Sequence, residues 1–237
     1  MTVPIWNPEW LESSVRRVRE PEVWRGVETQ HLSATTLLVD RQDEHDVLEQ
    51  LLEDSKPALP ATVKKHFLLI TPFRYAPLHA SRFRRAGESG LWYGAGTLEA
   101  ACAEVAHWRR RFIADSAGLA NEKIVSNHTF FAALVDGHGI DLMQAPWLAC
   151  RPLWTGDDYT HTHALAGAAN AAGMELIRYK SVRAPGHACV AVLVPDALHE
   201  PDGGLDRTRQ TWSCTATREH VMMMSELDRS LRFEFGR

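Results

Sequence analysis

The sequence predicts an α+β protein in which a sheet is flanked by helices. The first observation is the irregular order of segments along its 237 residues: helix-like segments come first, strands and helices then mix, and strands predominate toward the end. This order differs from the regular alternation of strand and helix that indicates a parallel α/β sheet. The second observation is a hydrophobic content of 45%, which is enough for a sizeable core. The length fits one large domain, or one domain with an extension.

The composition argues against several classes of protein. The net charge is −4 and the pI is about 6.3, whereas nucleic-acid-binding domains are usually basic, so no direct nucleic-acid binding is expected. The first ten residues, MTVPIWNPEW, do not resemble a signal peptide, and no apolar run approaches the ~20 residues of a membrane span. We therefore expect a cytoplasmic protein with reduced, mostly buried cysteines. These are scattered and form no CxxC pair: Cys102, Cys150, Cys189 and Cys214.

Residues 1–62 are expected to form an N-terminal helical extension of the main domain, residues 63–237. Asp40 is a suitable N-cap for a helix that runs to about Glu53, with an apolar stripe on one side and acids on the other. The preceding TTLLV at 35–39 fits either a short strand or the end of a helix.

In the main domain, the hydrophobic pattern first predicts two strands and a helix. HFLLIT at 66–71 is a short apolar run before a proline, and GLWYGA at 90–95 is a second run between glycines. Thr97 is an N-cap for a helix that continues to about Phe112. Glu104 falls at the edge of the apolar stripe of this helix, where a carboxylate can reach into a cleft beside the sheet. The stripe consists of Leu98, Ala101, Cys102, Val105, Trp108 and Phe112.

The remainder of the chain is expected to be mostly strands. One helix is predicted over 159–172, with Asp157 or Asp158 as its cap and Gly173 as its C′ residue. A strand over 174–181 would carry Ser181 at its end. Further strands are predicted at 124–135, 138–142, 187–194, 210–218 and 231–235.

Several common catalytic motifs are missing from the sequence, namely GxGxxG, the Walker loop and HExxH. Twelve histidines invite a metal site, but His161 and His163 would point to different sides of a helix. Their spacing places no third ligand, so we expect no metal. A serine or cysteine nucleophile with a His–Asp pair has weak support, because the GxSxG turn is missing as well.

Residues 68–112 combine groups suited to an anionic, sugar-bearing ligand. Arg74 and Arg82 lie eight residues apart, and a guanidinium matches phosphate oxygens in a bidentate way. Tyr93 and Glu104 then follow Arg82 at two intervals of eleven residues. Each residue also has a structural alternative. The arginines could cover hydrophobic edges or pair with acids, the tyrosine could pack in the core, and the glutamate could face solvent.

Taken together, four stretches resemble the RES-domain family. They are TPFRY at 71–75, SRF at 81–83, LWYGAGTLEAACAE at 91–104 and RYKSVR at 178–183. The resemblance covers about residues 66–195. The family is named for its Arg, Glu and Ser, and it supplies the toxins of bacterial RES–Xre toxin–antitoxin systems.

The resemblance implies an ADP-ribosyltransferase-like fold that acts on NAD as substrate and needs no metal. Matched by motif, the implied NAD-site residues are Arg82, Tyr93, Glu104 and Ser181, together with Arg74 or, as a substitute for it, Arg25. The arginines would neutralise the pyrophosphate and the tyrosine would contact the nicotinamide half. The glutamate would stabilise an oxocarbenium-like state, and the serine would orient the glutamate or the ribose.

The resemblance also implies a partner, an Xre-like helix-turn-helix antitoxin that silences the toxin and binds DNA in its place. A homo-oligomer is a further possibility, with the N-terminal helices as its surface. The leading hypothesis is a toxin that depletes NAD by hydrolysis or phosphorolysis. The alternatives are a protein ADP-ribosyltransferase and a catalytically inactive binding or scaffold relative. The sequence leaves open whether water, phosphate or a protein accepts the ADP-ribosyl group.

Overall fold

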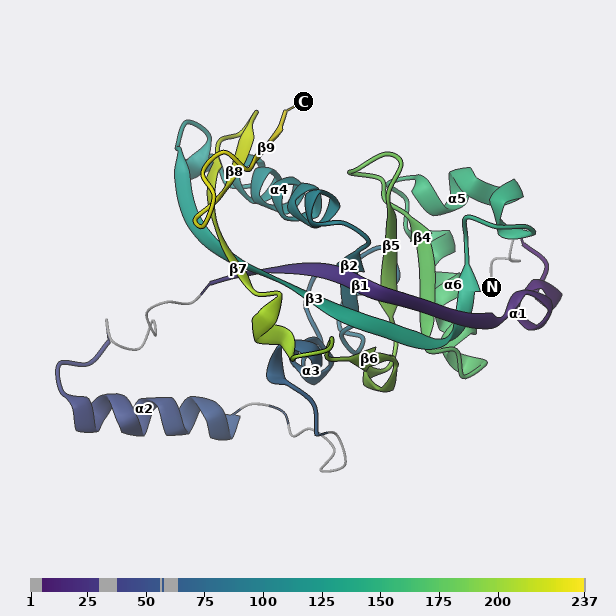
Figure 1. Ribbon diagram of the computed structural model, residues 1–237, viewed down its shortest axis with the longest axis horizontal. Helices are drawn as coiled ribbons and strands as arrows, with labels where there is room; N and C mark the ends of the chain where they lie inside the picture. The colour runs from purple at the N-terminus through teal and green to yellow at the C-terminus, as the bar shows by residue number, and fades with distance from the viewer. Residues whose placement is uncertain (1–5, 30–37, 56, 58–63, 237) are drawn as a thin grey trace.

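The sheet is organised around one long strand, β3 (Ile124–Asp141), in a computed structural model that describes residues 6–29, 38–55, 57 and 64–236 (Figure 1). Antiparallel neighbours of β3 are β1 (Arg16–Glu28) and β7 (Gln210–Ala216). Its C-terminal end pairs in parallel with β4 (Leu176–Lys180). β3 therefore connects the two halves of the sheet.

The strand order is β1-β2-β5-β4-β3-β7-β8-β9, and β6 pairs with β3 outside this path. β1 pairs with both β2 and β3, so five strands close into a ring while β7, β8 and β9 extend it as an antiparallel wing. The remaining strands are β2 (Trp92–Ala95), β5 (Ala188–Val192), β6 (Leu198–His199), β8 (Val221–Ser225) and β9 (Arg232–Phe235).

Helices cover the sheet unevenly. In Figure 1, α4 (Leu98–Ala114) lies above β1 and β3, and it packs on β1, β2 and the β7–β9 wing. α2 (Gln42–Ser55) projects from the body. None of the helices among the described residues is long and apolar enough to cross a membrane. The other helical segments are α1 (Glu9–Ser14), α3 (Phe67–Arg74), α5 (Arg151–Thr155), α6 (Thr160–Ala171), and the 3₁₀ turns η2 (Ala117–Leu119), η3 (Trp147–Cys150), η4 (Pro195–Ala197) and η5 (Leu205–Arg207).

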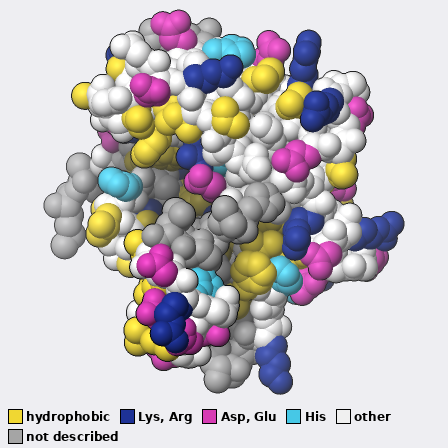
Figure 2. Space-filling model, turned by 90° about the vertical axis from the view of Figure 1, so that its left-hand side faces the viewer, with side chains coloured by type: hydrophobic (Ala, Val, Ile, Leu, Met, Phe, Trp, Pro, Cys, Tyr) yellow, Lys and Arg dark blue, Asp and Glu magenta, His cyan; other side chains and the backbone are white. Residues whose placement is uncertain are grey.

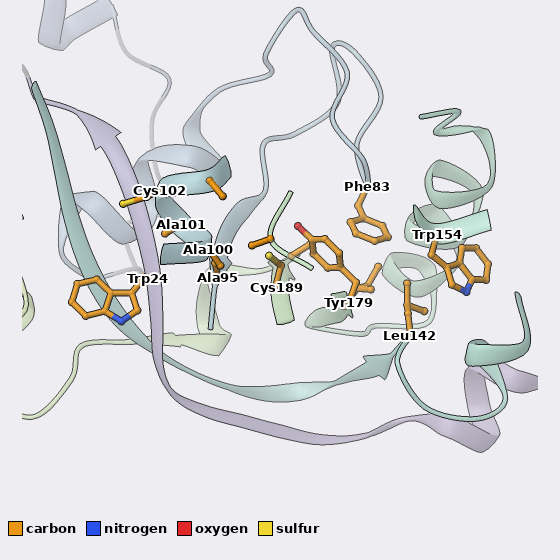
Figure 3. Close-up of a cluster of buried hydrophobic side chains, with 14 of the residues drawn as sticks. Trp24, Phe83, Ala95, Ala100, Ala101, Cys102, Leu142, Trp154, Tyr179 and Cys189 are labelled. Atoms are coloured by element: carbon orange, nitrogen blue, oxygen red, sulfur yellow. The ribbon is translucent and has the colours of Figure 1, made fainter. Parts of the chain in front are cut away.

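Alternating side chains of β3 enter two separate cores. Phe130 and Ala132 join the larger cluster, part of which is drawn in Figure 3. Phe131 and Ala133 join the smaller cluster on the opposite face with Trp92. Both faces of β3 are thus covered, and successive side chains point to opposite sides of the sheet, as strand geometry requires.

The expected α+β class is correct, as are the capped helix α4, the helix α6 and the strands β2, β4, β5, β7 and β9. The side chain of Thr97 accepts a hydrogen bond from the backbone N of Ala100. Gly173 has φ +72°, so it ends α6 in the left-handed conformation that favours glycine. The helix expected from Asp40 to about Glu53 is α2. Of the ambiguous residues 35–39, residues 35–37 lie outside the described part of the chain, and Leu38 and Val39 belong to neither a helix nor a strand.

The helical character expected for residues 1–62 is wrong over β1, which is a full member of the sheet. Pro21 is accommodated because the β1–β3 register shifts between Glu20 and Val23. At such an irregularity the ladder of hydrogen bonds is interrupted, so the missing backbone N–H of a proline costs no hydrogen bond. Buried Asp141 on β3 accepts hydrogen bonds from Arg16 at 2.6 Å and from Arg178 at 3.0 Å, which links β1 and β4 to β3.

Two further expectations are corrected. The 66–71 run is helix α3, whose N-cap is His66. Its buried residues, Leu69 and Ile70, are adjacent, and a helix can turn both toward the core whereas a strand would place them on opposite faces. The strands expected at 124–135 and 138–142 are one continuous strand. A Cβ at Gly139 would lie 2.0 Å from the carbonyl O of Leu176, so this glycine allows a close approach of two strands and does not end β3. β6 and β8 are additional to the expected strands.

Candidate active site

A cavity of about 870 Å³ lies between α4 and the sheet. Its walls come from β1, β2, α4, the turn that contains Arg82, and the segments around Tyr159 and Arg183. Tyr179 and Cys189, which Figure 3 shows close together, belong to its lining. The volume falls within the range of about 300–1,000 Å³ that is typical of small-molecule and cofactor sites.

Arg82 is held rigidly at one end of the cavity. Its Nη1 donates hydrogen bonds to the carbonyl oxygens of Trp154 and Gly156, both at 2.8 Å. Its guanidinium carbon lies 5.0 Å from the ring centroid of Tyr159. Arg82 is only 9% exposed, and no carboxylate in the described part of the chain forms a salt bridge with it, so this buried cation is suited to an anionic ligand.

Tyr93 supports the turn that carries Arg82. Its hydroxyl accepts a hydrogen bond from the backbone N of Phe83 at 3.1 Å and shares one with Ser81 Oγ at 2.9 Å. Burial raises the pKa of this hydroxyl above its ordinary range. The phenol therefore positions its neighbours, while its ring lines the cavity.

Glu104 extends from α4 into the same end of the cavity. Ser181 Oγ donates a hydrogen bond to Glu104 Oε1 at 3.3 Å and accepts one from the backbone N of Ala184 at 3.0 Å. Burial raises the pKa of Glu104, and the nearby Arg183, Ser181 and Arg82 oppose this shift. A partly buried carboxylate held among donors and two cations is thus available to interact with developing positive charge.

Arg25, on β1, is the second cation of the cavity, and it is partly buried. Its Nη1 donates to the carbonyl oxygen of Tyr93 at 2.9 Å, while its Nε has no hydrogen-bond partner among the described residues. Burial lowers its pKa to about 10, so it remains charged at neutral pH. Arg74 lies elsewhere: it ends α3, and its Nε donates to the carbonyl oxygen of Pro57 at 2.9 Å. Of the two alternatives for the first arginine, the geometry favours Arg25.

The opposite end of the cavity has a different chemistry. Glu28 of β1 forms an ion pair with Arg109 of α4. Burial lowers the pKa of His128, which lines the cavity beside this pair, to about 4, so its imidazole is neutral at pH 7. Trp108 and Phe112 are 44% and 53% exposed, which corrects the expectation that both are buried on the inner stripe of α4. Both line the cavity. Figure 2 shows hydrophobic and charged side chains around a hollow on this side of the molecule.

The cysteines of the cavity are not suited to act as thiolate nucleophiles, and the histidines that the structure describes there are not grouped as metal ligands. All four cysteines are free, and burial raises the pKa of Cys189 to about 12, so its thiol is protonated at neutral pH. His107, one turn after Glu104, has a pKa of about 4, chiefly because it is buried. Among the described residues, no three or more His, Cys, Asp or Glu side chains are grouped so that they could hold a metal ion.

Comparison with known proteins identifies the family. The model of the RES domain matches residues 59–216, which is more than half of the chain. The chain belongs to the RES-domain family. Among solved structures, this RES-domain protein is similar to a crystal structure of the MbcT–MbcA toxin–antitoxin complex of M. tuberculosis. The sequence identity is 15%, the match covers 89% of this chain and 92% of that chain, and the TM-score is 0.50. A comparison with curated proteins gives no match.

Within this RES domain, four residues singled out in the sequence come together at one end of the cavity: Arg82, Tyr93, Glu104 and Ser181. Arg25, named in the sequence as the substitute for Arg74, also lines the cavity. Glu28 and Arg183 were not singled out, although Arg183 follows Ser181 within the RYKSVR stretch. The matched range begins at residue 59, so β1 with Arg25 and Glu28 lies outside it. Pairing of β1 with β3 brings these residues to the cavity, and no local motif could have indicated that pairing.

Proposed function

We propose that this RES-domain protein is the toxin of a toxin–antitoxin system and that it cleaves the bond between nicotinamide and ribose in NAD. The observation that carries the proposal is the position of Glu104. Its carboxylate is partly buried and lines a cavity large enough for a dinucleotide, receives a hydrogen bond from Ser181 and lies near Arg82 and Arg183. Cations for a pyrophosphate and a carboxylate for a cationic ribose thus share one site.

The proposed reaction needs no strong general acid. The bond from C1′ of the ribose to the nicotinamide nitrogen breaks, and its electron pair stays on the nitrogen, which turns the pyridinium into neutral nicotinamide. Glu104 stabilises the oxocarbenium-like charge on the ribose, and Ser181 holds the carboxylate in place. An acceptor oxygen then bonds to C1′ and its proton is released. Water would give ADP-ribose, and phosphate would give ADP-ribose 1″-phosphate.

Arg25 and Arg82 are proposed to hold the pyrophosphate. Arg82 is buried and Arg25 is partly buried, and the backbone carbonyls that orient each guanidinium do not neutralise its charge. Tyr93 is proposed to act mainly through Arg82, because its hydroxyl is already bonded to the turn at 81–83. Arg74 is given no role in this site.

Turnover of NAD by the purified protein tests the proposal. We expect loss of NAD and release of nicotinamide. Both are measured by chromatography, in reactions with and without phosphate. Phosphate-dependent product would identify phosphorolysis, and label retained on protein would identify ADP-ribosylation. Glu104→Gln should abolish turnover, whereas Glu99→Gln, an exposed position on the same helix, should not change it. A folded wild-type protein that consumes no NAD would refute the activity, and full turnover by Glu104→Gln would refute the site.

We also propose a helix-turn-helix antitoxin as partner and the cytoplasm as the place of action. The similar crystal structure contains a toxin with its antitoxin, which supports the search for a bound partner. The test is co-expression with a small helix-turn-helix protein encoded by an adjacent gene. We expect a stable complex that no longer consumes NAD. Separate elution of the two proteins, with NAD turnover unaffected by the second, would contradict the proposed pairing.

A further inference from the structure

The cavity has two ends whose separation is set by α4 and β1. These elements run in the same direction along it, toward the left in Figure 1. Two contacts establish this register. A Cβ at Gly26 would lie 2.8 Å from Cγ2 of Val105, and Glu28 forms an ion pair with Arg109, four residues further along α4. From Gly26 to Glu28 the strand rises about 7 Å, and four helical residues rise about 6 Å, so the two elements remain in step.

The catalytic end contains Glu104, and the far end contains the Glu28–Arg109 pair. Arg25 also lines the cavity, and its Nε is buried without a hydrogen-bond partner among the described residues. Trp108 provides an exposed aromatic surface beside the far end. The site is therefore asymmetric. One end has a carboxylate, and the other has an aromatic ring beside an ion pair whose charges cancel.

This asymmetry matches the two halves of a dinucleotide. If the nicotinamide ribose lies at Glu104, as the proposed function requires, the pyrophosphate binds close to it, at Arg25 and Arg82. The adenosine half then extends toward Glu28. A purine can stack on an exposed aromatic ring such as Trp108, and a carboxylate such as Glu28 can accept a hydrogen bond from a ribose hydroxyl.

We propose that the far end is the adenosine subsite and that Glu28 selects a ribose with a free 2′-hydroxyl, which favours NAD over NADP. This inference rests on the proposed function for the orientation of the ligand. A carboxylate suits a 2′-hydroxyl, whereas an unpaired arginine suits a 2′-phosphate. Glu28 acts twice: it repels a 2′-phosphate, and its ion pair occupies Arg109, which would otherwise attract that phosphate.

Glu28→Gln is the decisive substitution. It preserves size and leaves the fold intact, because the Glu28 side chain is 57% exposed at the end of β1. Removal of the negative charge releases Arg109, so binding of a 2′-phosphorylated ligand should improve. Arg109→Gln is the reciprocal variant and should strengthen discrimination against the 2′-phosphate. Glu99→Gln, outside the cavity, is the matched control and should behave as the wild type.

The test uses ADP-ribose and ADP-ribose 2′-phosphate, because their binding can be measured by calorimetry without turnover. Wild type should prefer ADP-ribose, and Glu28→Gln should shift the ratio of the two dissociation constants by about tenfold toward the 2′-phosphorylated ligand. Relative kcat/KM values for NAD and NADP should shift in parallel. A ratio that Glu28→Gln leaves unchanged, equal binding of both ligands by wild type, or binding of neither would overturn the proposal. If the binding ratio shifts while NAD is not consumed, the selectivity stands and the proposed cleavage fails.

Discussion

Tyr93→Phe removes one hydroxyl from the support of Arg82 and leaves the aromatic ring in place. In the wild type, that hydroxyl accepts a hydrogen bond from the backbone N of Phe83 and shares one with Ser81. Both bonds hold the turn from which Arg82 extends. The substitution therefore separates two roles of the tyrosine: positioning the turn, and direct contact between the hydroxyl and a ligand.

The size of the effect follows from the two lost hydrogen bonds. Each contributes about 1 kcal/mol net, and the N–H of Phe83 is left unsatisfied in a largely buried place, so we expect a loss of about 2 kcal/mol in the free energy of unfolding. For a protein of this size that corresponds to a decrease of roughly 4–8 °C in Tm. Displacement of Arg82 should also lower kcat/KM for NAD by about tenfold, equivalent to about 1.4 kcal/mol of transition-state stabilisation.

Thermal unfolding and NAD turnover are measured on the same preparation. Tyr75→Phe is the matched control, because it removes a hydroxyl from a tyrosine that is 39% exposed. We expect the control to retain the Tm and activity of the wild type. If Tyr93→Phe keeps the wild-type Tm but loses NAD turnover, its hydroxyl contacts the substrate directly, and the positioning role is refuted.

Three further outcomes are expected. In steady-state kinetics, Arg25→Gln should raise the KM for NAD about tenfold or more, because Arg25 lines the cavity. Arg74→Gln should leave the KM unchanged, because Arg74 lies elsewhere. Equal effects of the two substitutions would contradict the choice of Arg25 as the first arginine of the site. Burial raises the pKa of Glu104, so stability is lost as the pH rises through the ordinary glutamate pKa, and the loss is complete above the pKa of the folded state. Glu104→Gln should therefore raise Tm at pH 8, and this increase in Tm should vanish as the pH falls below the ordinary glutamate pKa. An increase in Tm that does not depend on pH would show that the charge of Glu104 is not its cause. The pKa of His128 is lowered from 6.5 to about 4, so the free energy of unfolding should decrease as the pH falls through that range. His128→Gln should reduce this decrease, measured by urea titration at several pH values. A decrease as large as in the wild type would contradict the role of His128.

Features set by neighbouring residues could be predicted from the sequence. The cap at Thr97 and the C′ glycine at 173 depend on backbone geometry within a few residues. Prediction failed for α3 and β1. A short apolar run does not distinguish a helix from a buried strand. β1 is rich in charge and interrupted by proline, and its strand conformation depends on pairing with β3, more than a hundred residues away.

The same distinction divides the candidate site. Arg82 and Glu104 are close enough in sequence to form a recognisable stretch with Tyr93. Arg25 and Glu28 reach the cavity through a long-range strand pairing, and only the folded chain shows this. Trp108 was assigned to the core because its spacing on α4 fits the buried stripe, but an apolar residue at such a position can also line a cavity.

A crystal structure of the Glu104→Gln variant with intact NAD tests the central claim most directly. The substitution should prevent cleavage while the cavity is retained. We expect the nicotinamide ribose beside Gln at position 104, the pyrophosphate at Arg25 and Arg82, and the adenosine toward Glu28. NAD bound outside this cavity, or bound within it in the reverse direction, would contradict the claim.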